Sequence, residues 1–128
     1  MNSTSYSFVL IDDEPGVLKA LELLLKALGH SVRSFSDSEE AIRYLKEGGF
    51  RHDECLRGSE VVILSDLKMP RKSGHDVLQV RNKSASELRF ILMSAHANEE
   101  DIELAIKDGA CAFLPKPFTP QTLFDALA

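Results

Sequence analysis

The stretch VVILSDLKMP (residues 61–70) runs from a block of apolar residues into a carboxylate, Asp66. A segment such as VVIL, apolar at every position, is typical of a strand in a parallel sheet that helices cover on both faces. Asp66 then stands at the carboxyl end of this strand, and open α/β sheets bind their ligands at that edge. The stretch therefore predicts a parallel α/β sheet and a functional role for Asp66.

On both sides of this stretch, short apolar segments alternate with segments of helical periodicity. The strands are expected at residues 7–11, 31–35, 61–64, 90–93 and 111–114. The helices are expected to follow Pro15 and Asp37, to cover 75–82, to run from Asn98 to Gly109, and to begin again near 119. Five strands that alternate with five helices predict the α/β class, with a doubly wound five-stranded parallel sheet and helices on both faces.

Helical spacing also predicts which side chains face the sheet. In the first helix the apolar residues at helical spacing are Val17, Leu18, Leu21, Leu24, Leu25 and Leu28. In the fourth helix Ile102, Ala105 and Ile106 are expected to face the sheet, which leaves Leu104 on the outer face. The segment 48–58 has no periodicity and is expected to be a surface loop that extends the second helix or its exit. Surface positions are expected for His30, His52 and His75.

Composition limits the classes of protein to which the chain can belong. Its 128 residues suit one globular domain. A net charge of −5 and a pI of about 5.3 argue against direct binding of nucleic acid or of an anionic membrane by this domain. No export signal or membrane span is apparent, so a cytoplasmic location is expected, with Cys55 and Cys111 as reduced thiols.

Polar residues stand where the expected strands end. Asp12 and Asp13 follow the first strand, Asp66 ends the third, Ser94 follows the fourth and Lys116 follows the fifth. Carboxylates crowded at one edge raise one another's pKa unless a cation holds them together, and an all-oxygen site suits Mg²⁺, with Mn²⁺ as an alternative. A lysine and a hydroxyl opposite that ion would bind phosphoryl oxygens, so Asp66 is predicted to be a nucleophile that forms an aspartyl phosphate.

Each of these residues also has a simpler explanation when it is taken singly. The Asp12–Asp13 pair could cap the helix that follows it. Ser94 could be an ordinary residue at a strand end, and Lys116 a solvated surface charge. Their joint placement after the required strands favours the phosphoacceptor hypothesis.

At four segments the chain resembles the receiver domain of two-component response regulators, and the resemblance covers essentially its whole length. The segments are DDEPG (12–16), SDLKMPRKSG (65–74), MSAH (93–96) and FLPKPF (113–118). The resemblance implies the flavodoxin-like strand order 2-1-3-4-5 and a cis Lys116–Pro117 bond. It also implies that Mg²⁺ is bound by Asp13, Asp66 and the backbone carbonyl of Lys68, with Asp12 acting partly through water, and that Ser94 and Lys116 bind the phosphoryl oxygens.

The resemblance further implies a residue that takes part in the conformational switch and residues that set the lifetime of the phosphoryl group. Phe113 stands where the family carries a switch aromatic residue. Lys68 and His96 stand beside the path of the water that hydrolyses the aspartyl phosphate. Together with Ala95 they are expected to tune how long the phosphoryl group lasts. A partner surface is expected on the fourth helix and fifth strand, at Glu103, Leu104, Lys107 and Ala112.

The function implied is a signalling switch that takes its phosphoryl group from a sensor histidine kinase, and not a turnover enzyme. We expect residues 1–128 to form one receiver domain, with a DNA-binding transcriptional output domain beyond Ala128 and a phosphorylation-dependent homodimer. A free-standing receiver and a phosphorylation-independent scaffold are the alternatives. A haloacid-dehalogenase-type phosphatase is disfavoured because Lys68 stands where that family needs an Asp, and a flavodoxin because DDEPG is acidic.

Overall fold

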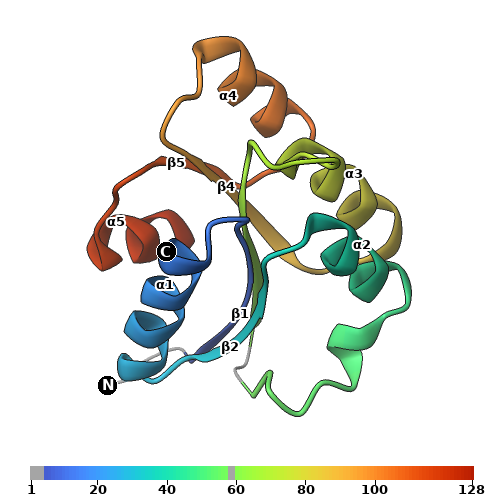
Figure 1. Ribbon diagram of the computed structural model, residues 1–128, viewed down its shortest axis with the longest axis vertical. Helices are drawn as coiled ribbons and strands as arrows, with labels where there is room; N and C mark the ends of the chain where they lie inside the picture. Colours follow the sequence, from blue (N-terminus) through green and yellow to red (C-terminus); the bar gives the residue numbers. More distant parts are fainter. Residues whose placement is uncertain (1–4, 58–59) are drawn as a thin grey trace.

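The computed structural model describes residues 5–57 and 60–128, which form a single α/β sandwich (Figure 1). The strands are β1 (Tyr6–Ile11), β2 (Ser31–Phe35), β3 (Glu60–Asp66), β4 (Arg89–Ser94) and β5 (Ala112–Pro115). The helices are α1 (Pro15–Ala27), α2 (Ser38–Lys46), α3 (Gly74–Ser84), α4 (Glu99–Lys107) and α5 (Pro120–Leu127), with a short 3₁₀ helix η1 (Gly49–Arg51). The predicted alternation of strands and helices is confirmed.

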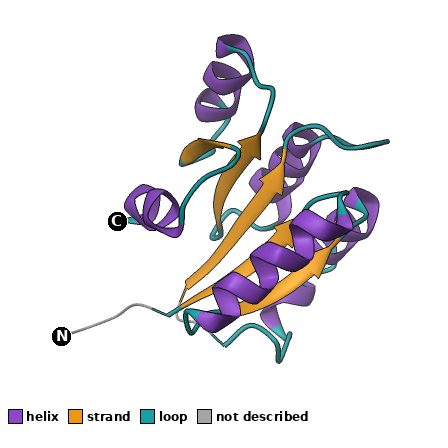
Figure 2. Cartoon of the chain, turned by 60° about the vertical axis from the view of Figure 1, so that its left-hand side comes forward, coloured by secondary structure: helices purple, strands orange, loops and turns teal. Residues whose placement is uncertain are grey.

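The strands form one parallel sheet in the order β2-β1-β3-β4-β5, as predicted. Helices lie on both sides of the sheet (Figure 2). Successive residues of a strand point to opposite faces, so the sheet supports two cores. One core combines Val9, Ile11 and Ile63 with residues of α2, α3 and α4, and the other combines Phe8, Leu10, Val62 and Leu64 with residues of α1 and α5.

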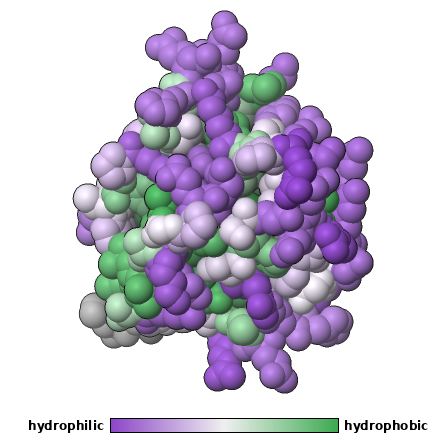
Figure 3. Space-filling view, viewed as in Figure 1, coloured by the Kyte–Doolittle hydropathy of each residue, from purple (hydrophilic) through white to green (hydrophobic). Residues whose placement is uncertain are grey.

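The predicted inward stripe of α4 is only partly correct, and the apolar residues of α1 are only partly buried. Ala105 is fully buried in α4, but Ile106 is 48 % exposed, because it lies about 100° further round the helix and beyond the contact with the sheet. Leu104 is 46 % exposed, as predicted. In α1 the buried pair is Leu18 and Leu25, whereas the face that carries Leu23, Leu24 and Leu28 is exposed. Figure 3 shows hydrophobic side chains gathered at the lower left, where Figure 1 draws α1.

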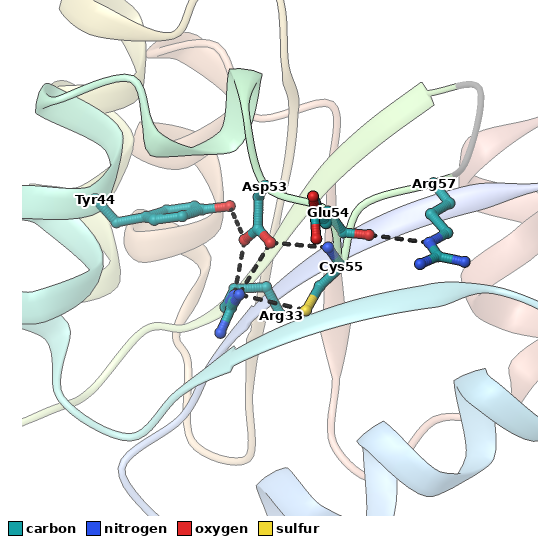
Figure 4. Close-up of polar contacts among 6 residues, drawn as sticks. All are labelled: Arg33, Tyr44, Asp53, Glu54, Cys55 and Arg57. Atoms are coloured by element: carbon teal, nitrogen blue, oxygen red, sulfur yellow. Dashed lines mark hydrogen bonds and ion pairs between the residues drawn. The ribbon is translucent and has the colours of Figure 1, made fainter.

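The segment 48–57 is more ordered than the predicted surface loop. Phe50 of η1 is buried, and Asp53 binds the Arg33 guanidinium through two hydrogen bonds of 2.7 and 2.9 Å (Figure 4). Tyr44 donates a third hydrogen bond, of 2.7 Å, to the same carboxylate. The Arg33 hydrogen bond holds the pKa of Asp53 well below its usual range, so this ion pair fastens the segment to β2 at neutral pH. Gly58, the last residue of the predicted loop, lies outside the described residues.

Two of the three histidines expected at the surface are partly buried. The Nδ1 atom of His30 accepts a hydrogen bond of 3.0 Å from the backbone N–H of Tyr6, and its ring centroid lies 5.0 Å from that of Phe124. His75 contacts Asp108 at 2.6 Å, which joins the start of α3 to the end of α4. His52 is exposed, as predicted. Because His30 and His75 are covered by residues from distant elements, the polarity of their own sequence neighbours did not predict their burial.

Candidate functional site

The carboxyl ends of the strands meet at one edge of the sheet and are tied to one another by backbone hydrogen bonds. The N–H of Leu67 donates to the carbonyl of Met93 at 2.9 Å, and the N–H of Lys116 donates to the carbonyl of Ser94 at 2.9 Å. Figure 1 shows the β1–α1 and β3–α3 connections at this same end. The Lys116–Pro117 peptide bond is cis, as predicted. The edge therefore brings Asp12, Asp13, Asp66, Ser94 and Lys116 into one neighbourhood.

Three carboxylates converge at this edge. Asp12, Asp13 and Asp66 each offer one oxygen, and these oxygens all lie within 4.8 Å of one another. Asp12 is fully buried, Asp66 is 6 % exposed and Asp13 is half-buried. A compact set of carboxylate oxygens matches the hard oxygen ligands that Mg²⁺ prefers, so the residues present fit this ion.

Lys116 is the cation beside these carboxylates. Its Nζ lies 2.8 Å from Asp12 Oδ2 and 3.4 Å from Asp66 Oδ2. Burial acts to lower the pKa of the Lys116 ammonium, but Asp12 and Asp66 outweigh it and raise this pKa overall. Burial raises the pKa of Asp66, and the charge of Asp12 adds to that rise while Lys116 opposes it. Three carboxylates against one ammonium leave two negative charges, which one divalent cation balances.

The helix-cap explanation accounts for little of this arrangement. The N-cap residue of α1 is Glu14, and its side chain makes no capping hydrogen bond. Asp12 Oδ1 does accept a hydrogen bond of 2.9 Å from the backbone N–H of Glu14, which orients the carboxylate. Its other oxygen, Oδ2, contacts Lys116. Asp12 is thus oriented by the turn into α1 while it faces the candidate site.

Ser94 ends β4 with its side chain almost fully buried. Its Oγ accepts a hydrogen bond of 3.1 Å from the backbone N–H of His96, which leaves the hydroxyl proton free to be donated to another acceptor. The side chains of Ala95 and His96 that follow are exposed. Ser94 therefore lies where β4 ends and the connection into α4 begins.

The remaining predicted site residues, Lys68 and Phe113, differ in burial. Lys68 is exposed on the loop after β3, and Phe113 is partly buried against the core beneath α4. The roles of the Lys68 carbonyl as a metal ligand and of Phe113 as a switch stay predictions. The sequence analysis included Gly74 in a segment of the family resemblance but gave it no structural role; its N–H donates a hydrogen bond of 2.8 Å to the carbonyl of Leu67 and closes the loop after Asp66. The printed sequence offered a signal, since Gly74 ends the quoted segment SDLKMPRKSG.

Comparisons with known proteins agree with this geometry. The family model described as the response regulator receiver domain matches residues 8–128. The chain is 32 % identical over 117 residues to the phosphoglycerate transport system transcriptional regulatory protein PgtA of Salmonella typhimurium, covering 91 % of this chain and 26 % of the relative. It is 31 % identical over 127 residues to the response regulator protein TmoT of Ectopseudomonas mendocina, covering 99 % and 53 %.

A solved structure shows the same fold. A response regulator receiver domain protein from Clostridium thermocellum superposes with a TM-score of 0.80 at 31 % identity, covering 95 % of this chain and 90 % of that chain. This chain spans about a quarter to a half of the length of the two curated relatives above. In the parts of the chain that the structure describes, no helix combines the length and apolar character that crossing a bilayer requires.

Proposed function

The chain belongs to the response regulator receiver family, and from that premise we propose that it is a signalling switch that is phosphorylated on Asp66 in a Mg²⁺-dependent reaction. Receiver domains are signalling proteins that histidine kinases phosphorylate. The observation that carries the proposal for this chain is the placement of Lys116 Nζ between Asp12 and Asp66, 2.8 and 3.4 Å away, at the edge where Asp13 also lies.

In the proposed reaction an Oδ atom of Asp66 attacks phosphorus in the phosphohistidine of a sensor kinase. The new O–P bond forms as the P–N bond breaks, and the imidazole nitrogen keeps the electron pair of the broken bond. A Mg²⁺ held by Asp12, Asp13, Asp66 and the carbonyl of Lys68, or Mn²⁺ in its place, would neutralise charge on the phosphoryl oxygens. Lys116 and the hydroxyl of Ser94 supply the remaining positive charge and hydrogen bond.

We expect the protein incubated with acetyl phosphate and Mg²⁺ to gain one phosphoryl group, measured as intact mass. Chelation of the metal is expected to abolish the adduct, because the two net negative charges of the site would repel the phosphoryl donor. An adduct of equal yield in the presence of excess chelator would contradict the metal requirement. Absence of any adduct with Mg²⁺ present would contradict the proposed function itself.

The same proposal includes an output. The relatives PgtA and TmoT are a transcriptional regulatory protein and a response regulator, and each is longer than this chain. We infer that phosphorylation of Asp66 controls a DNA-binding transcriptional output domain outside residues 1–128, and that this takes place in the cytoplasm. Ser94 and Phe113 are the residues proposed to carry the change to α4 and β5, since Ser94 leads into α4 and Phe113 packs behind it.

Replacing Leu104 with Glu is expected to weaken phosphorylation-dependent dimerisation. Leu104 is 46 % exposed on α4, beside the exposed Glu103 and Lys107, so a carboxylate there would have to be desolvated in an interface. Sedimentation of the wild type and of Leu104→Glu, with and without beryllofluoride and Mg²⁺, measures the effect. Leu23→Glu is a matched control, because Leu23 is 57 % exposed on α1 across the sheet. Equal association of all three proteins would place the dimer surface elsewhere.

A further inference from the structure

The loop between β3 and α3 carries the carbonyl of Lys68 that is proposed to bind the metal. Its ends are fixed, because the N–H of Leu67 donates to Met93 and the carbonyl of Leu67 accepts from Gly74. Met69 packs against the core beneath α2 and α3. The outer part of the loop, Pro70 to Lys72, has no such core contact and must be held in another way.

This outer part contains a strained turn. Arg71 has a φ of +67°, and of the described residues it is the one non-glycine residue with positive φ. The N–H of Lys72 donates a hydrogen bond of 2.8 Å to the carbonyl of Pro70, two residues earlier. A hydrogen bond of this span around a residue with positive φ defines a classic γ-turn, which is rare and costs on the order of 1–3 kcal/mol at a residue other than glycine.

Residues at the N-terminus of α2 bind this turn through ion pairs and a hydrogen bond. Arg71 Nη2 lies 2.8 Å from Asp37 Oδ1, and Arg71 Nε lies 3.1 Å from Glu39 Oε1. The Oγ of Ser38, which is buried, donates a hydrogen bond of 3.3 Å to the carbonyl of Pro70. We call these contacts the α2 clamp, and it joins Asp37, Ser38 and Glu39 to Pro70 and Arg71.

The clamp residues on α2 are themselves held in place. Asp37 is the N-cap of α2, and its carboxylate accepts a hydrogen bond of 2.9 Å from the backbone N–H of Glu39. That hydrogen bond, together with Arg71, holds the pKa of Asp37 below its usual value, so this carboxylate is ionised at neutral pH. The Arg71 guanidinium is therefore held by the anchored carboxylate of Asp37 and by the more exposed carboxylate of Glu39, although the Arg71 side chain is itself 61 % exposed.

We propose that Arg71 is a positioning residue, which holds the β3–α3 loop in its strained turn through the α2 clamp and so places the carbonyl of Lys68 for the metal. The inference rests on the proposed function, because it concerns the same Mg²⁺ site. The ion pairs of Arg71 are exposed, and exposed ion pairs contribute little to the free energy of unfolding. The α2 clamp therefore affects the conformation of the loop more than the stability of the fold. The strain makes the clamp necessary, because a non-glycine residue released from it would leave positive φ.

The test compares Arg71→Ala with Arg71→Gly. Alanine removes the guanidinium and keeps the penalty for positive φ, whereas glycine removes the guanidinium and most of that penalty. We expect Arg71→Ala to weaken Mg²⁺ binding about fivefold or more, measured by isothermal titration in the absence of a phosphoryl donor, and Arg71→Gly to stay within about twofold of the wild type. Lys72→Ala is the matched control, since Lys72 is an exposed cation on the same loop, and its affinity should also stay within about twofold.

The outcomes separate this inference from the proposed function. If the wild type binds Mg²⁺ and Arg71→Ala binds it equally well, or if Arg71→Gly is as weak as Arg71→Ala, the positioning role of Arg71 is overturned. If the wild type does not bind Mg²⁺, the proposed function fails, and the positioning role fails with it. Thermal unfolding of the three variants distinguishes a local effect from a structural one, because a positioning role predicts weakened Mg²⁺ binding by Arg71→Ala with an unfolding midpoint close to that of the wild type.

Discussion

Asp66→Asn is expected to abolish the phosphoryl adduct completely. Asp66 ends β3, is 6 % exposed and lies 3.4 Å from Lys116 Nζ, whereas Asp12, the other carboxylate that contacts this lysine, is fully buried. The carboxamide of asparagine has nearly the same shape but is a far weaker nucleophile and carries no charge. Intact mass after incubation with acetyl phosphate and Mg²⁺ measures the loss.

The loss should not come from unfolding. Burial raises the pKa of Asp66, so the folded state favours the protonated carboxyl group, and ionisation at neutral pH lowers the stability of the metal-free protein. The stability that protonated Asp66 contributes is complete below its unfolded pKa and is lost as the pH rises through its folded pKa. Asn therefore should not decrease the free energy of unfolding at pH 7, which urea denaturation checks.

A matched substitution tests whether the effect is specific to this position. Asp125 lies exposed on α5, where Gln121 donates a hydrogen bond to it, and Asp125→Asn makes the same chemical change away from the site. That variant should be phosphorylated like the wild type. An adduct that persists in Asp66→Asn would show that another residue accepts the phosphoryl group.

The fold was predictable because its strands are buried on both faces. VVIL and FILM are apolar at every position, and this composition distinguishes strands of a covered parallel sheet from amphipathic helices. The convergence of Asp12, Asp66 and Lys116 followed from topology, because the carboxyl ends of parallel strands share an edge. Neither inference needed the position of any individual side chain.

The features that sequence reasoning missed depend on contacts between distant elements. Asp53 is ordered by Arg33 and Tyr44, which lie 20 and 9 residues away in the chain. Ile106 fits the helical stripe of α4, but the contact of that helix with the sheet is narrow and leaves the side chain exposed. The positive φ of Arg71 has no local signal, because glycine is the residue that such a turn predicts.

Gly74→Ala is expected to destabilise the fold and to distort the site, because the first residue of α3 packs directly on the backbone that follows Asp66. A Cβ at Gly74 would collide with the carbonyl oxygen of Asp66 and would lie 2.6 Å from Leu92 Cδ2 and 2.9 Å from Leu67 Cα. Two of these three atoms belong to backbone, which cannot turn aside as the end of a flexible side chain can. Overpacking of this kind lowers the free energy of unfolding by about 1–3 kcal/mol or more.

The displaced backbone is that of Asp66 and Leu67, so Gly74→Ala should also weaken Mg²⁺ binding and slow phosphorylation. Gly16→Ala is the matched control, because the Cβ it would add in the first turn of α1 meets no atom within 4 Å beyond its chain neighbours and the nearby backbone of its own helix. There alanine should leave the free energy of unfolding unchanged or raise it by up to about 1 kcal/mol, since alanine favours helix more than glycine does. Urea unfolding of both variants, followed by Mg²⁺ titration of the folded proteins, measures the two effects. If Gly74→Ala matched Gly16→Ala in stability and in Mg²⁺ affinity, the packing of α3 would not shape the proposed phosphoacceptor site.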